Sequence, residues 1–451
     1  MNISKIILAF LIICFLIIAF ISDIKNYDFI TYFLLSLTTI TVFIFFLKKK
    51  FTYFFLVFFF SSLVSFYLFE TYYSLQNYTQ EYLAIKQAKK DGVPYDQRTK
   101  KEVYDFYKEK RNKENVVVPV SGMDYLKYEN SKDNQKLILS GVSKSFNVFC
   151  NESGFWTYYN SDRYGFNNPD KVWEKKKNII LIGDSNVHGG CVTVENSIAG
   201  KLRSISRSNV INLGMSSNGP LLNYATFKEF GNFKNTTIFW FYSEENDLGD
   251  LEIELNYKIL HQYLDNENFK IDLKSKINET DRIASEIINS KYGKIHQKNP
   301  IFDFKSILKL QNLRKIITIA TNNKIELTKI KVPDGYNADT LQSLIKILLK
   351  VNDEARLNNS SFVFVYKPAR EFYDNRVSIL HNESKNNLKY KNYIFSALKK
   401  NNIKFIDLDL EMKKYNENIL SLYPFKIRSH FNEEGQEIIA KVLFKNLFIL
   451  N

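Results

Sequence analysis

One serine and one histidine stand where the chain could use them for nucleophilic catalysis. Ser185 follows the apolar run 179–182 through Gly183 and Asp184, and His430 comes just before a C-terminal helical pattern. A serine hydroxyl is a weak nucleophile at neutral pH and needs a base to accept its proton. Histidine suits that role, because its unperturbed pKa is about 6.5. These residue types favour acyl-transfer chemistry wherever a fold brings them together.

The other four histidines are weaker candidates for the base. His188 lies on the same expected helical turn as the serine, where its ring would have difficulty reaching the hydroxyl. His261 and His296 fall in a polar stretch between strands, and His381 falls in a polar loop. We therefore expect His430 to be the base.

Acyl transfer also needs hydrogen-bond donors for the charge that develops on the substrate oxygen, each contributing roughly 3–4 kcal/mol. The candidates are the backbone N–H of Ser185, a backbone N–H in the turn Gly214–Ser217, and the side-chain amide of Asn246. Asp184 and Asp247 are expected to support the same site. Each motif alone is weak, since an Asn-Asp pair commonly caps a helix. Their order and their positions after strands favour a shared site.

Beyond residue 170, short apolar strands alternate with helical patterns, which is typical of a parallel sheet joined by crossover helices. Ligands bind at the carboxyl ends of such strands. Polar residues follow each predicted strand, so we expect them to meet at one edge of the sheet. The predicted strands are 178–182, 209–213, 236–242, 361–366 and 403–408, and the predicted helices are 196–206, 220–232, 340–357, 384–400 and 434–448.

The N-terminal region, residues 1–69, predicts membrane helices. Segments 6–22, 29–47 and 51–69 contain no charged residue, and about 20 apolar residues span the hydrocarbon of a bilayer. The triple lysine 48–50 marks a cytoplasmic loop. Three crossings then place the N-terminus in the cytoplasm and residue 70 onward outside a bacterial cell membrane. A cleaved signal peptide is the alternative for the first segment.

The rest of the chain is interpreted as two parts. Residues 70–135 are expected to form a basic stalk, and residues 136–451 the α/β domain with a mostly helical insertion at 250–336, a candidate lid. The 451 residues carry a formal charge of +14, but lysine is spread along the chain without an aromatic platform. We therefore expect no nucleic-acid partner, and place the basic stalk near anionic lipid or in solvent.

Two of the three cysteines fall in the exported part, close to Ser185. Cys150 and Cys191 could pair there, because an oxidising compartment permits disulfides. The bond would close a loop of about 40 residues and stabilise the fold by roughly 4 kcal/mol. Two free buried thiols are the alternative, and Cys14 lies within a predicted membrane segment. We expect no metal site and no cofactor.

Four short blocks resemble the conserved blocks of the SGNH/GDSL hydrolases, a family of serine esterases and acyl-transferring enzymes. They are LIGDS, INLGMSSNGP, EENDL and SHFNEEG, within residues 178–248 and 361–445, and segment 149–173 resembles the lead-in of a membrane-anchored branch. The resemblance implies a flavodoxin-like, three-layer fold with about five parallel strands. It implies Ser185 as nucleophile, His430 as base and Asn246 as oxyanion donor. The second-block glycine falls on Ser217, with Gly214 as the alternative.

One departure from the family concerns the acid that orients the histidine. The family has an aspartate two or three residues before it, where this chain has Arg428 and Ile427. We therefore expect a backbone carbonyl to hold the ring of His430, giving a Ser-His dyad. An acid from elsewhere, such as Asp407 or Asp409, is the alternative, and weak or absent catalysis is another.

Together these features favour a membrane-anchored esterase or O-acyltransferase outside the cytoplasm. Its expected substrates are small acyl esters, such as acetyl esters, of envelope or exported glycans, and its expected partners are the lipid bilayer and that glycan. A glycan-binding or assembly protein without catalysis is one alternative. A protein whose membrane helices are the functional part is another. Lys367 and Arg370 are interpreted as solvated loop charges, with contact to an anionic sugar as the alternative.

Overall fold

The computed structural model describes most of the chain. The described ranges are 3–24, 28–46, 48–76, 80–111, 115–129, 136–176, 179–231, 233–290, 338–374 and 388–448, with the single positions 307, 308, 310 and 313. The chain divides into two compact units, of which the first holds residues 1–78 and 300–329 and the second residues 79–299 and 330–451.

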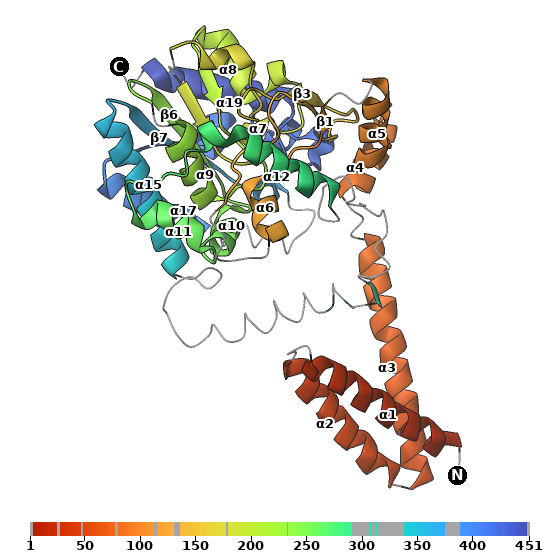
Figure 1. Ribbon diagram of the computed structural model, residues 1–451. Helices are drawn as coiled ribbons and strands as arrows, with labels where there is room; N and C mark the ends of the chain where they lie inside the picture. Colours follow the sequence, from red (N-terminus) through yellow and green to blue (C-terminus); the bar gives the residue numbers. More distant parts are fainter. Residues whose placement is uncertain are drawn as a thin grey trace. The chain divides into compact units, whose positions relative to one another are not determined.

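The first unit contains three helices at the three predicted apolar segments: α1 (Ile3–Ile24), α2 (Asp28–Phe45) and α3 (Lys49–Gln76) (Figure 1). Among the described residues, Lys49–Tyr72 of α3 is long and apolar enough to cross a membrane. Lys5–Ile17 of α1 is a shorter apolar helix. A single membrane-spanning candidate therefore stands out, and the crossing by all three helices stays a prediction.

The second unit is built on a five-stranded sheet in which all neighbouring strands are parallel. In chain order the strands run 2-1-3-4-5 across the sheet, which is the flavodoxin-like order of doubly wound folds. The prediction of an α/β fold with five parallel strands is confirmed. The order across the sheet is β5 (Val210–Asn212), β4 (Ile179–Ile182), β6 (Thr237–Ser243), β7 (Ser361–Lys367) and β8 (Lys404–Asp407).

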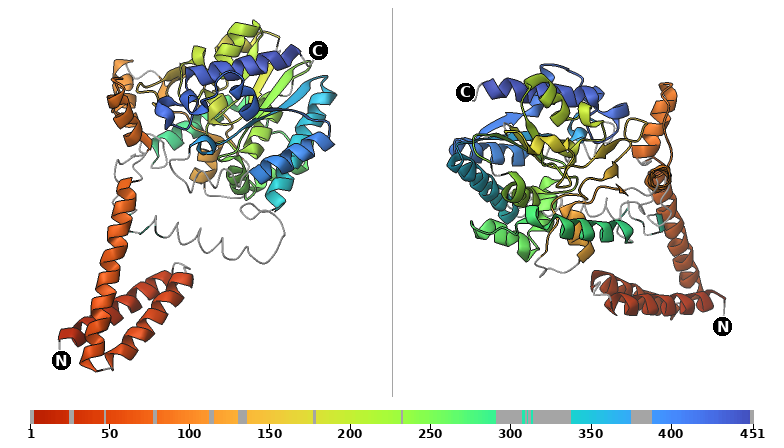
Figure 2. Two further views of the ribbon diagram at one scale, coloured as in Figure 1. Left: turned by 180° about the vertical axis from the view of Figure 1, so that it is seen from behind. Right: turned by 45° about the horizontal axis from the view of Figure 1, so that its top comes forward.

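Both faces of the sheet are buried, as the apolar runs of its strands require. Ile180 and Ile182 of β4 face one core, and Ile179 and Leu181 face the other. Figure 2 shows the C-terminal helix on one face and the green and cyan helices on the other. The first core is covered by α9 (Pro220–Thr226), α10 (Asp247–Glu254), α11 (Lys258–Asp265), α12 (Ile277–Asn289), α15 (Ala338–Leu357) and α17 (Leu388–Lys400), and the second by α8 (Ile198–Ser206), α18 (Leu408–Lys413) and α19 (Glu433–Phe448).

Short helical turns connect these elements. The 3-10 turns are η1 (Asp170–Trp173), η2 (Val194–Asn196), η4 (Leu273–Lys276), η7 (Arg370–Tyr373), η8 (Ile419–Leu422) and η9 (Pro424–Lys426), and the π-helical turn η3 (Phe227–Gly231) extends α9.

The stalk predicted over residues 70–135 differs from the structure. Residues 80–111 and 115–129 form α4 (Gln80–Lys90), α5 (Lys100–Lys110), β1 (Val116–Val117) and α6 (Gly122–Glu129). Val103 of α5 and Met123 of α6 are fully buried in the core that the sheet helices share. The domain therefore begins well before residue 136. The apolar positions of this stretch are few and lie among basic residues, so the sequence pattern did not indicate a buried face.

Strand β1 of this stretch belongs to a second, three-stranded sheet. Strand β1 pairs in parallel with β2 (Phe146–Val148), which pairs antiparallel with β3 (Tyr158–Asn160). The loop between β2 and β3 contains Glu152. Its ends are closed by the N–H of Phe149 on the carbonyl of Thr157 and by the N–H of Thr157 on the carbonyl of Cys150.

Within the insertion predicted over 250–336, the described residues up to 289 contain α10, α11, η4 and α12. The buried side chains of α11 and α12 belong to the core on one face of the sheet. This part is thus a packed layer of the domain and not a lid. Residues 291–337 of the insertion, apart from the four single positions, lie outside the described residues.

Candidate active site

Ser185 lies just beyond the carboxyl end of β4, after a tight turn formed by Gly183 and Asp184. The turn needs Gly183, because a Cβ there would lie 2.8 Å from Val187 and 2.9 Å from Phe241. Asp184 caps the short helix α7 (Ser185–His188) by accepting the N–H of Asn186 at 3.0 Å. Because β5 and β6 flank β4 on opposite sides, Ser185 lies at the switch point of the sheet, where ligands bind in such folds.

His430 brings its imidazole to this serine from the loop before α19. Its Nε2 lies 2.8 Å from the Oγ of Ser185. The loop is fixed by Asn432, whose side-chain oxygen accepts the N–H of Gly435 at 2.9 Å and whose amide donates to the carbonyl of Ser421 at 2.9 Å. The predicted pair of nucleophile and base is therefore in contact.

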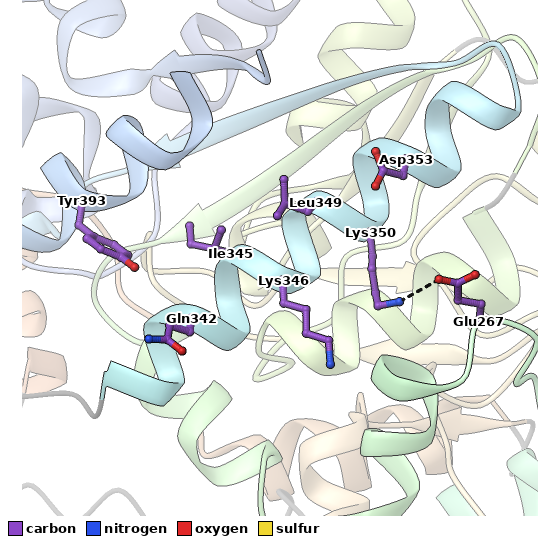
Figure 3. Close-up of a pocket in the computed structure, with 8 residues that line it drawn as sticks. All are labelled: Glu267, Gln342, Ile345, Lys346, Leu349, Lys350, Asp353 and Tyr393. Carbon is purple, nitrogen blue, oxygen red and sulfur yellow. Dashed lines mark hydrogen bonds and ion pairs between the residues drawn. The ribbon is translucent and has the colours of Figure 1, made fainter. Parts of the chain in front are cut away.

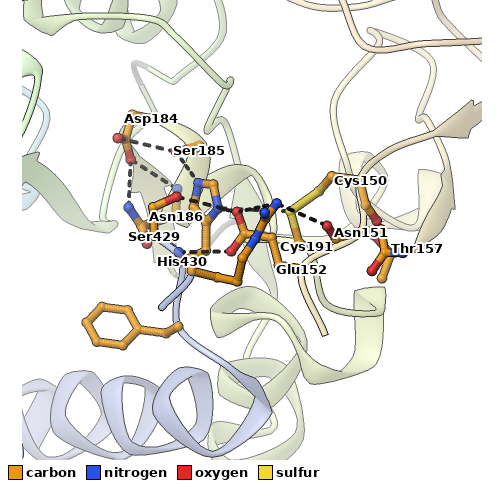
Figure 4. Close-up of polar contacts among 12 residues, drawn as sticks. Cys150, Asn151, Glu152, Thr157, Asp184, Ser185, Asn186, Cys191, Ser429 and His430 are labelled. Carbon is orange, nitrogen blue, oxygen red and sulfur yellow. Dashed lines mark hydrogen bonds and ion pairs between the residues drawn. A yellow bond between two sulfur atoms is a disulfide. The ribbon is translucent and has the colours of Figure 1, made fainter. Parts of the chain in front are cut away.

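The acid that holds His430 is Glu152, from the loop between β2 and β3. Its Oε1 lies 2.8 Å from Nδ1 of His430, and its Oε2 accepts the backbone N–H of His430 at 3.1 Å. Figure 4 shows Ser185, His430 and Glu152 with the disulfide close to the glutamate (Figure 4). The three side chains have the arrangement of a Ser-His-Glu triad, in which the acid sets the tautomer and orientation of the ring.

The expected dyad is therefore wrong, and so are both alternative acids. Asp407 caps α18 and pairs with Lys391 at 2.6 Å. Asp409 accepts the hydroxyl of Tyr373 at 2.7 Å. Asp407 is the N-cap residue of α18 and Asp409 lies in its first turn, so both carboxylates have partners other than His430.

The charges of Glu152 and His430 stabilise each other. Burial alone raises the pKa of Glu152, but the charge and hydrogen bonds of His430, with Arg428 nearby, lower that pKa to about 2. Burial alone lowers the pKa of His430, but the charge of Glu152 and its hydrogen bond raise the pKa above its ordinary value. Glu152 is therefore an anion at neutral pH, and it favours the imidazolium that forms when the serine loses its proton.

Two features hold Glu152 in place. A disulfide joins Cys150 to Cys191, with 5.3 Å between their Cα atoms, and so ties the loop of Glu152 to the chain just after Ser185. Arg428 donates to the carbonyl of Asn151 at 3.2 Å and lies 3.8 Å from the carboxylate of Glu152. The pairing of the two cysteines was the sequence signal that could have located the acid, because Glu152 follows Cys150 by two residues.

The backbone N–H groups predicted as oxyanion donors differ in whether they already have an acceptor. The N–H of Gly214 donates to the side chain of Asn212 at 2.8 Å, so Gly214 is not the donor. Ser217 has a left-handed φ of 69°, and the described residues place no acceptor on its N–H. The N–H of Ser185 is likewise at the start of a helix, where it has no partner within the helix. Among the backbone donors, Ser185 and Ser217 remain.

Asn246 is the first residue outside α10, at the end of the turn after β6. One N–H of its amide donates to Asp250 at 2.8 Å, which leaves the second N–H for a ligand. Asp247, one residue on, is fully buried and accepts the N–H of Ser243 at 3.0 Å. Burial and the charge of Asp184 raise the pKa of Asp247, and the hydrogen bond from Ser243 ties Asp247 to the turn that carries Asn246.

The remaining described histidines have structural partners. His188 is fully buried, with Nδ1 2.8 Å from the hydroxyl of Ser216 and Nε2 2.9 Å from that of Tyr159. His261 contacts the carbonyl of Leu255 at 2.7 Å. His296 and His381 lie outside the described residues.

The interpretation of Lys367 and Arg370 as solvated charges is wrong. Lys367 is 1 % exposed and pairs with Glu245 at 2.9 Å. Arg370 is also buried and pairs with Asp374 and Glu371. Because both cations are neutralised inside the protein, neither is placed to contact an anionic sugar.

Two other features of the described residues resemble ligand sites, one a cluster of metal-binding residue types and the other a hollow. Glu152, Cys191 and His430 lie close enough to share a metal ion, but the sulfur of Cys191 is in the disulfide and cannot act as a thiolate ligand. A hollow on α15, drawn in Figure 3, is lined by residues such as Lys346 and Tyr393. None of the triad residues lines this hollow, so it is separate from the candidate active site.

Comparison with known proteins does not establish a family for this chain. No family model matches the sequence, and no curated protein matches it. One solved structure, of a candidate lipolytic protein of the G-D-S-L family from Desulfitobacterium hafniense DCB-2, aligns with 59% of this chain and 98% of its own. The identity is 12% and the TM-score 0.29, a likeness too low to establish a family.

Proposed function

We propose that this protein is a serine esterase or O-acyltransferase of the SGNH type, anchored in the bacterial cell membrane and acting outside the cytoplasm. The observation that carries the proposal is the contact of 2.8 Å between the Oγ of Ser185 and Nε2 of His430, with Glu152 2.8 Å behind the ring. This is the geometry that activates a serine hydroxyl.

The reaction follows from these contacts. Nε2 of His430 accepts the proton of Ser185 as Oγ attacks the ester carbonyl, and Glu152 stabilises the imidazolium. The backbone N–H groups of Ser185 and Ser217 and the amide of Asn246 donate to the oxygen that gains the negative charge. His430 then gives its proton to the departing alcohol, which leaves an acyl-serine. Water or a sugar hydroxyl removes the acyl group by the same steps.

The extracytoplasmic location has two supports. The disulfide between Cys150 and Cys191 is of the kind that persists in oxidising compartments. The apolar helix within Lys49–Tyr72 is long enough to anchor the chain, and Lys48–Lys50 stands at its start, on the side that the positive-inside rule makes cytoplasmic. Three crossings would place the triad in the periplasm or outside the cell.

The substrate class depends on that location. A domain tethered at the outer surface of the membrane meets envelope and exported glycans, and small O-acyl groups such as acetyl are esters that one activated serine can transfer. Hydrolase and transferase share the acyl-serine and differ only in the acceptor. Acetyl release measured with and without an added glycan acceptor would separate them, because a transferase loads the acceptor while a hydrolase releases acetate.

The test is turnover of an activated acetyl ester by the full chain in detergent. Ser185→Ala is expected to reduce turnover to the background rate, while Ser275→Ala, which alters an exposed serine on η4, keeps the full rate. A fluorophosphonate should label the wild type and not Ser185→Ala. Equal turnover in wild type and Ser185→Ala would remove the serine from its role.

A glycan-binding protein without catalysis is the competing proposal. Its support was the lack of an aspartate before His430, and Glu152 supplies an acid from another part of the chain. The fluorophosphonate experiment separates the two, since a folded binding protein with an inactive serine would not be labelled.

A further inference from the structure

We propose that residues 80–98, a segment we call the brace, position Glu152 against His430. The brace comprises α4 and the chain that follows it to Arg98, and in the sequence it begins four residues after the end of the apolar helix α3. The effect of the brace on catalysis rests on the proposed function, because it acts through the triad. The contacts of the brace with the two loops do not depend on that function.

The brace holds the loop of Glu152 on both sides of the glutamate. Asn151, the residue before Glu152, donates its side-chain amide to the carbonyl of Asp96 at 2.9 Å. Two residues after the glutamate, the carbonyl of Gly154 accepts the N–H of Asp96 at 2.8 Å. Trp156 adds a hydrogen bond from its indole to the carbonyl of Arg98 at 3.2 Å.

The contact with Gly154 is close enough to require glycine. Its φ is +95°, and a Cβ at this position would lie 2.6 Å from the carbonyl oxygen of Pro94 and 3.5 Å from the ring of Tyr95. Any larger side chain would have to push the brace and the loop apart. The loop and the brace are therefore fitted to each other.

The same brace holds the loop that carries His430. Helix α4 packs against η9, the turn that ends four residues before His430. The ring of Tyr95 lies 5.9 Å from that of Phe425 in η9. Phe425 and Lys426 both have left-handed backbones, with φ of 54° and 59°. Such a strained turn persists only where its surroundings hold it.

Tyr95 takes part in the contacts with both loops, because it lies close to Gly154 in the loop of Glu152 and to Phe425 in the chain before His430. Its hydroxyl is buried, and Arg428 and Glu152 are among the charges that act on it. The brace thus touches the loop of the acid on one side and the loop of the base on the other. Neither loop is part of the central sheet. The distance between the two loops therefore depends on their contacts with the brace, in addition to the disulfide.

The test compares Gly154→Ala with a control outside the brace, both in the full chain. Gly154→Ala introduces a Cβ that meets Pro94, whereas the control Ser275→Ala alters an exposed serine on η4. With an activated acetyl ester, Gly154→Ala is expected to lower kcat by about 10²-fold, with KM changed less than about twofold. Ser275→Ala should keep kcat. Equal kcat in both variants would overturn the proposal.

A second readout does not depend on activity. The groups that act on the imidazole of His430 are Glu152, Asp184 and Glu245, with Arg428 facing Glu152. Moving Glu152 away should lower the pKa of His430, measured by NMR titration of labelled histidine and assigned with a His430→Gln variant. A variant that only destabilises the fold would lower the melting temperature and leave this pKa unchanged, which would contradict the brace.

Asn151→Ala keeps the proposal testable if Gly154→Ala does not fold, because it adds no bulk and removes the bond to Asp96 together with the bond that Asn151 accepts from the N–H of Gly154. It should move kcat and the pKa of His430 in the same directions. The two proposals also fail separately. If Ser185→Ala retains full turnover, the esterase is refuted, and the titration of His430 still decides whether the brace positions Glu152.

Discussion

Glu152 Oε1 lies 2.8 Å from Nδ1 of His430, although 278 residues separate the two along the chain. A second bond, from the backbone N–H of His430 to Oε2 at 3.1 Å, fixes the carboxylate against the loop as well as against the ring. With Nδ1 as donor to the glutamate, Nε2 is free to accept the proton of Ser185. Glu152 therefore completes a triad with His430 and Ser185.

Loss of the carboxylate charge should therefore be costly. Glu152→Gln keeps the size of the side chain but lets it donate to Nδ1, which favours the wrong tautomer of His430. We expect kcat to fall by about 10³–10⁴-fold, measured with an activated acetyl ester. Glu195→Gln, at an exposed position on η2, is the control and should match wild type. A loss below tenfold would show that His430 is oriented by other groups.

The rate should depend on pH through His430. The neutral imidazole is the base, so kcat/KM rises as the ring loses its proton and is half-maximal at the pKa of the ring. Because Glu152 raises that pKa above its ordinary value, the midpoint should lie above about pH 6.5. Glu152→Gln should shift the midpoint to lower pH. The measurement is kcat/KM against pH, with the Ser185→Ala rate subtracted as background.

The disulfide should contribute to both stability and activity. It closes a loop between residues 41 apart, for which loop-closure entropy gives about 4 kcal/mol. Cys150→Ala is expected to lower the melting temperature and also kcat, because Cys150 lies two residues from Glu152. Cys14→Ala, at the free cysteine in α1, is the control. Unchanged kcat after Cys150→Ala would show that other contacts alone hold the acid.

The amide of Asn246 should act on the transition state. Asn246→Ala is expected to lower kcat by about 10²–10³-fold, the usual effect of removing one oxyanion donor, with KM little changed. Asn256→Ala removes an exposed amide just beyond the end of the same helix and serves as control. If Asn246→Ala raised KM and left kcat unchanged, the amide would bind substrate in the ground state instead.

Much of the sheet could be predicted because its signal is local. The strands from Ile179 to Asp407 are short apolar runs that need no distant information to be recognised, and their order gave the polar residues a common edge. Ser185 and His430 followed from the residue types at that edge. The beginning of the domain was harder, because the core positions of α5 and α6 are few and lie among lysines.

Glu152 could not be predicted in the same way. It lies in a loop without hydrophobic periodicity, and its partner is at the other end of the chain. Spacing rules look for the acid near the histidine, where this chain has Arg428, which instead binds the carbonyl of Asn151. Only the pairing of Cys150 with Cys191 linked that loop to the serine.

The sequence by itself determined the elements, the edge of the sheet and the pair Ser185 and His430, because strand patterns and motif spacing are local properties of the chain. The tertiary structure alone decided which carboxylate meets the imidazole, which N–H groups remain available for an oxyanion, and that residues 80–98 pack beside the acid. Those features depend on contacts between distant loops, and loop contacts are set by packing in three dimensions, which leaves no periodic signal in the sequence.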